Sequence, residues 1–83
     1  MDKVLVEVYL AAAGRSYDVY IPLASPMNEV LQLISTLLSD LSEGSFMAND
    51  DTVLCDAESG TIFNINIPVA ELGIKNGSKL VLI

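Results

Sequence analysis

Few residues in this sequence could do chemistry, and their types exclude most catalytic sites. The chain has no histidine, so the commonest general base is missing and neither Ser-His nor Cys-His nucleophile pairs can form. The single cysteine, Cys55, lies in an apolar stretch, where a thiol is usually inert core. The five glycines are scattered one to a turn, which excludes a glycine-rich phosphate loop. We therefore expect no enzymatic activity and no cofactor.

Carboxylates are plentiful and gather in the second half of the chain at Asp50, Asp51, Asp56 and Glu58. A calcium loop needs oxygen ligands at alternate positions, a glycine in mid-loop and a final glutamate, and this spacing does not supply them. We interpret the cluster as a solvated acidic face and expect no metal.

Composition places the chain among folded proteins that bind neither nucleic acid nor membranes directly. Its 83 residues are 52% hydrophobic and 18% charged, which is typical of one globular domain spanning residues 1–83. The formal charge of −7 repels phosphate backbones and anionic lipids. No apolar run reaches the roughly 18 residues of a membrane helix. The N-terminus does not resemble a signal peptide, so we expect a cytoplasmic protein, at most peripheral to the inner membrane face through protein partners.

The start of the chain predicts a β-hairpin. Val4–Leu10 alternates between two faces. Gly14 can take the positive φ of a hairpin loop, and the chain returns as Ser16–Ile21. We expect the inward residues to be Val4, Val6, Val8, Leu10, Tyr17, Val19 and Ile21, and the outward ones to be Leu5, Glu7, Tyr9, Asp18 and Tyr20.

A helix is predicted from Ser25-Pro26 to about Leu41. Its apolar residues recur at three- and four-residue spacing, as in a helix that packs on a sheet. They are Met27, Val30, Leu33, Ile34, Leu37, Leu38 and Leu41. We interpret this wide stripe as the cover of the sheet; the alternative is an amphipathic helix that binds a partner.

The rest of the chain predicts short elements. In the polar segment 42–51, Phe46 and Met47 either pin the loop to the core or form part of a contact surface. Strands are expected at 52–56 and 61–65, although the pattern does not settle which of Val53, Leu54 and Cys55 face inward. A one-turn helix at 69–74 leads to a closing strand, Leu80–Ile83, which is apolar on both faces and therefore central.

This order of elements predicts an α+β fold of the β-grasp type. A long first strand and an apolar last strand fit best as parallel neighbours at the centre of a mixed sheet. The sheet would have four to five strands, with the one long helix packed across one face.

The same order, with the spacing within Val69–Ile83, resembles ubiquitin. Val69 and Ile74 match core positions of the turn before the last strand, and Gly77 falls at a tight positive-φ turn. Leu80 and Leu82 match inward residues, so Val81 and Ile83 would face outward.

Segment 71–83 is similar to the Gly-Ile-x-Asn-Gly-Asp-x-Leu ending of a small bacterial ubiquitin-like family, YukD or EsaB, although Ser78 stands where an aspartate is frequent. That resemblance implies a non-conjugated accessory component of Gram-positive type VII secretion, which binds protein components of the membrane-embedded machinery. Two alternatives stay open. One is the cytosolic domain of a larger membrane secretion component. The other is a sulfur carrier or modifier, which would need a terminal Gly-Gly instead of Ile83.

A partner-contact surface is predicted on the sheet face away from the helix. Outward apolar side chains would gather there, and a monomer rarely exposes such a set without use. The alternative is that loops cover them or that scattered exposure is simply tolerated. The candidate contact residues are Leu5, Tyr9, Tyr20, Val81 and Ile83.

Overall fold

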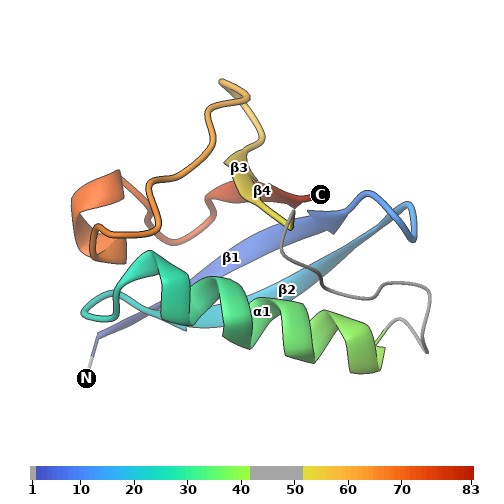
Figure 1. Cartoon of the computed structure of the whole chain (residues 1–83), viewed down its shortest axis with the longest axis horizontal. Coiled ribbons are helices and arrows are strands. Elements are labelled where there is room, and N and C mark those ends of the chain that lie inside the picture. The colour runs from blue at the N-terminus through green and yellow to red at the C-terminus, as the bar shows by residue number, and fades with distance from the viewer. Residues whose placement is uncertain (1, 42–51) are drawn as a thin grey trace.

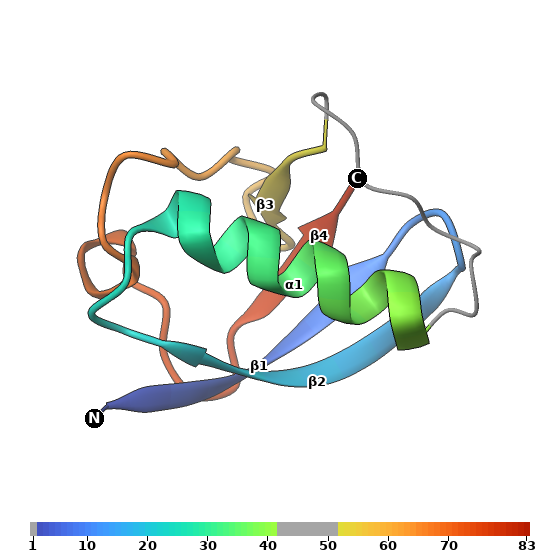
Figure 2. The same cartoon turned by 60° about the horizontal axis from the view of Figure 1, so that its bottom comes forward.

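The chain folds into a four-stranded sheet with a helix across one face (Figure 1). The computed structural model describes residues 2–41 and 52–83. The elements, in chain order, are β1 (Lys3–Leu10), β2 (Arg15–Pro22), α1 (Met27–Leu41), β3 (Leu54–Asp56), the short helix η1 (Val69–Leu72) and β4 (Lys79–Leu82). The strand order is β2-β1-β4-β3, with β1 and β4 parallel and the other pairs antiparallel. Helix α1 lies diagonally over the sheet (Figure 2). The predicted β-grasp is confirmed.

The opening hairpin follows from its alternating sequence. Its last pair joins Leu10 to Arg15. The loop closes through Gly14, which has a φ of 65° and donates its N–H to the Leu10 carbonyl oxygen at 2.9 Å. Residues predicted to face inward are buried along β1, and Val19 and Ile21 are buried in β2. The hairpin therefore has one apolar face against α1 and one open face.

The closing segment fixes the register at the centre of the sheet. Leu80 and Leu82 are buried, as are Val69 and Ile74 in the preceding turn. The Asn76 side-chain oxygen accepts the Leu5 N–H at 2.8 Å, and Gly77, with a φ of 86°, donates to the Leu5 carbonyl at 2.9 Å. The turn thus binds β1 just before β4 begins beside it. The predictions for this segment are confirmed.

Only part of the predicted helix stripe covers the sheet. Met27, Val30, Ile34 and Leu38 are buried, but Leu33, Leu37 and Leu41 are 49%, 38% and 50% exposed. Successive helical residues turn by about 100°, which places Leu33 and Leu37 at the margin of the buried stripe, whereas Leu41 shares the stripe's face but is the last residue of α1. The four buried residues alone cover the sheet. The prediction that all seven residues act as a cover is therefore wrong for these three leucines.

The predicted strand at 61–65 is also wrong. Its pairing with β3 is limited to one bridge, Cys55 to Ile62, with flanking backbone hydrogen bonds of 2.9 and 3.1 Å. The Asn64 side chain then accepts the Asn66 N–H at 2.9 Å, a local turn that ends the pairing. Beyond it, the carbonyls of Ile65 and Ile67 accept the first two amides of α1, each at 3.0 Å. This segment therefore caps the helix instead of extending the sheet.

Candidate interaction site on the open face of the sheet

Apolar side chains form a row across the sheet face opposite α1. Tyr9 pairs with Val81, Val81 pairs with Cys55, and Cys55 bridges Ile62. Next to this row, Val53 and Ile83 exchange backbone hydrogen bonds of 3.2 and 3.0 Å, which places their side chains on the same face. We call these six residues the outer patch: Tyr9, Val53, Cys55, Ile62, Val81 and Ile83.

Exposure varies strongly within the outer patch. Tyr9, Ile62 and Ile83 are 41%, 61% and 60% exposed, while Val53 and Val81 are half-buried. Cys55 is only 6% exposed although it faces outward, since it lies between Val81 and Ile62 in the row. The patch therefore offers three exposed side chains around a closely packed centre.

Leu5 and Tyr20, the other two predicted contact residues, are not brought into the outer patch. They pair with each other across β1 and β2. Between them and the Tyr9 row lies a charged row, in which Glu7 pairs with Asp18 on one side and Lys79 on the other. The five predicted residues therefore form two separate groups, and the prediction of one apolar set is corrected.

Three residues of the outer patch escaped the sequence prediction. Leu54 is buried on the helix side, so the neighbouring Val53 and Cys55 face outward, which answers the question that the uniformly apolar run left open. Ile62 joins the row only through its bridge to Cys55. The sequence predicts a strand at 61–65, but its pattern does not assign Ile62 to the outer face.

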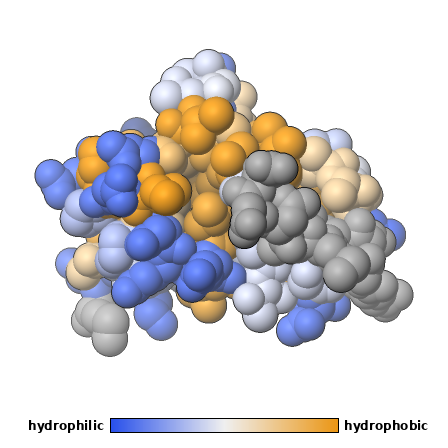
Figure 3. Space-filling model, in the orientation of Figure 1, coloured by the Kyte–Doolittle hydropathy of each residue, from blue (hydrophilic) through white to orange (hydrophobic). Residues whose placement is uncertain are grey.

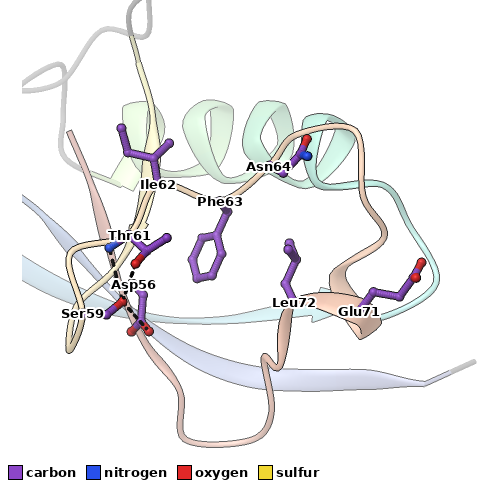
Figure 4. Close-up of a pocket in the computed structure, with 8 residues that line it drawn as sticks. All are labelled: Asp56, Ser59, Thr61, Ile62, Phe63, Asn64, Glu71 and Leu72. Atoms are coloured by element: carbon purple, nitrogen blue, oxygen red, sulfur yellow. Dashed lines mark hydrogen bonds between the residues drawn. The ribbon is translucent and has the colours of Figure 1, made fainter.

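A hollow of about 430 Å³ lies beside the patch at the β3 edge of the sheet (Figure 4). Phe63 and Leu72 point toward one another within it, and Ile62 lines it as well. In the same view, the Ser59 hydroxyl lies 3.1 Å from Asp56 Oδ2 and 2.9 Å from Thr61 Oγ1. These polar groups therefore satisfy one another instead of converging on a ligand.

Apolar surface is also present on the side of the molecule that carries α1. Figure 3 shows hydrophobic residues gathered across the middle of that view, below the pale tip formed by the loop after β3. The arrangement can bury apolar area against another protein.

The described residues contain neither a metal-ligand cluster nor a membrane-spanning helix. Among residues 2–41 and 52–83, no three histidine, cysteine, aspartate or glutamate side chains come together as metal ligands would. Asp50 and Asp51 of the acidic cluster lie outside the described residues, as do Phe46 and Met47. Within those same ranges, no helix has the length and apolarity needed to cross a bilayer.

Comparison by sequence finds no matching protein-family model and no matching curated protein. Comparison by structure finds the ubiquitin-like domain of the Mycobacterium tuberculosis type VII secretion protein ECCD1, with 21% identity, a TM-score of 0.79 and coverage of 100% of this chain and 99% of that one. Protomer 1 of the ESX-3 core complex matches at 20% identity and a TM-score of 0.75, over 99% of this chain and 16% of that one.

The same fold occurs in a different setting in the toluene 4-monooxygenase HD complex, with 12% identity and a TM-score of 0.81 over 98% of this chain and 96% of that chain. At these identities the likeness establishes a ubiquitin-like fold but does not establish an activity.

Proposed function

We propose that this chain is a non-catalytic, ubiquitin-like component of a type VII protein secretion system that acts by binding other proteins of the machinery. The observation that carries the proposal is the outer patch, an apolar surface on a sheet face that α1 leaves open. Such a patch, rimmed by polar residues, is typical of a protein contact site. A contact of this kind needs neither a cofactor nor covalent conjugation.

One resemblance in sequence and one in structure support a role in secretion. The ending at 71–83 is similar to that of the YukD or EsaB family of secretion accessory proteins. Independently, the fold is similar to the ubiquitin-like domain of a type VII secretion protein. The proposed site of action is the cytoplasmic face of the membrane-embedded apparatus, reached through protein partners.

A second candidate function is that of a ubiquitin-like domain in a larger membrane component of the same machinery. The match to the ESX-3 core complex favours it, since there the similar region makes up 16% of a longer chain. Under either candidate, the contact surface and the absence of catalysis are the same. The length of the gene product in the source cell separates the two.

Chemical cross-linking in the source cell tests the proposal. A cross-linkable amino acid at position 62 or 83 would sample partners of the outer patch, and position 58, on the exposed loop after β3, serves as the matched control. We expect type VII membrane components to be captured from positions 62 and 83 and not from position 58. Capture of unrelated proteins only, or unimpaired export after deletion of the gene, would reject the secretion role.

Intact-mass measurement of the chain purified from that cell tests the absence of conjugation. We expect a mass that contains no second polypeptide. A covalent adduct with another protein would reject this part of the proposal while leaving the binding surface intact.

A further inference from the structure

Leu33 and Leu37 of α1 lie toward the free edge of the sheet that β2 forms. Leu33 lines a shallow depression of about 130 Å³ together with Pro22, at the end of β2, and Glu29. Leu37 follows one turn later on the same helix face, so the pair lies along the side of α1 that borders β2. Leu33 and Leu37 are 49% and 38% exposed. These two leucines form an apolar surface beside the edge strand β2, and we call them the leucine wall.

Strand β2 also presents unpaired backbone groups along this edge. The backbone groups of odd-numbered β1 residues point toward the β4 side: the Glu7 N–H donates to the Ser78 carbonyl at 3.0 Å, and the Leu5 carbonyl accepts the Gly77 N–H at 2.9 Å. The even-numbered residues therefore bond to β2, through its residues 15, 17, 19 and 21. The remaining amides and carbonyls of β2, at Ser16, Asp18 and Tyr20, point to the outer edge. Within the described residues, no strand pairs with them.

Backbone edge and leucine wall together have the form of a β-augmentation site. An extended peptide that bonds to Ser16, Asp18 and Tyr20 would continue the sheet by one strand. Its residues alternate between faces, so every second side chain would lie on the α1 side, next to Leu33 and Leu37. Such a peptide needs apolar residues at alternate positions.

Charge selects among the possible occupants. Helix α1 has no basic residue, and Glu29 and Asp40 flank the leucine wall along its length. Asp18 stands in the middle of the β2 edge, against a single cation on that strand, Arg15. A second copy of this chain is disfavoured, because antiparallel β2–β2 pairing centred on Asp18 would oppose two aspartates on chains that each carry a formal charge of −7. Electrostatic complementarity favours a basic segment.

We propose that the β2 edge and the leucine wall of α1 form a second docking site, which takes an extended segment of a partner protein with alternating apolar residues and flanking lysines or arginines. This site is separate from the outer patch, since the two use opposite faces of the sheet. The chain could therefore bind two protein segments at once.

Selection from a library of random ten-residue peptides against the immobilised full chain tests this proposal. We expect the enriched sequences to alternate apolar residues and to carry net positive charge. Leu33→Ser and Leu37→Ser should each weaken binding of a selected peptide about tenfold, which corresponds to the loss of one apolar contact. Ile65→Ser, at an exposed isoleucine outside both sites, is the matched control and should leave binding unchanged.

Amide hydrogen exchange identifies the binding mode. A bound strand should slow exchange at Ser16, Asp18 and Tyr20 by about tenfold or more, and should change Tyr17 and Val19 little, because their amides already bond to β1. The proposal is overturned by enrichment of acidic or non-alternating peptides, by no enrichment at all, or by protection that appears at the outer patch instead. Dimerisation of the free chain that Leu33→Ser abolishes would replace the proposed partner with a second copy.

Discussion

The two faces of the sheet differ in what covers them, although apolar residues lie on both. In β1, Val8 and Tyr9 are neighbours in sequence, and one is fully buried while the other is 41% exposed. In the closing segment, Leu82 is fully buried and Ile83 is 60% exposed. Among the described residues, α1 is the only helix that lies across the sheet, so the apolar residues on the open face exceed what the core can bury. That excess is the physical basis for a binding surface.

Truncation on the covered face should have the largest effect on stability. Leu82→Ala removes a fully buried side chain and should lower the free energy of unfolding by about 2–5 kcal/mol, a large part of the total for a domain of this size. Urea denaturation measures it. The neighbouring Ile83→Ala is the control and should stay within about 0.5 kcal/mol. Equal losses for the two variants would show that the open face is as buried as the core.

The turn that sets the register between the faces should have an intermediate effect. Asn76→Ala removes the acceptor of the Leu5 N–H and should cost about 1 kcal/mol in thermal or urea unfolding. Asn76→Asp keeps a side-chain oxygen in the same place and should recover most of that loss. If alanine and aspartate are equally destabilising, the 2.8 Å hydrogen bond does not hold β1 to the turn.

How far the sequence predicts this molecule depends on how local the deciding interactions are. The alternation of Val4–Leu10 and the Asn76-Gly77 turn are local signals, and both predictions hold. Leu33 and Leu37 look identical to their buried neighbours, because helix periodicity gives the position of a stripe but not the width of the sheet it meets. Ile62 enters the outer patch through a single bridge to Cys55, because the turn at Asn64 ends the pairing there.

The charged row illustrates the same limit for the candidate site. Tyr20 and Tyr9 are both outward residues of one hairpin, and sequence reasoning groups them together. Strand pairing places Glu7 and Asp18 between them. Since register depends on the pairing of whole strands, the division of the open face into two groups is visible only in the structure.

Cys55 is an exception to the contrast between the two faces, because its side chain faces outward but is buried. A thiol reagent such as a disulfide dye should react slowly with the native chain. Ile62→Ala removes one flanking side chain and should raise the rate about tenfold while changing stability by less than about 1 kcal/mol. Ile65→Ala, an exposed isoleucine outside the row, should leave the rate unchanged. Equal acceleration by both variants would indicate a general loosening of this segment.

The outer patch is proposed to bind a partner and to contribute little to folding. The most direct test is affinity capture of secretion-system proteins by Val81→Asp and Ile83→Asp, with urea denaturation of each variant alongside. Tyr20→Asp is the matched control, since it carries the same substitution on the same face beyond the charged row. We expect both patch variants to stay folded and lose capture while Tyr20→Asp retains it. Folded patch variants that capture partners as well as the unmodified chain would contradict this proposal.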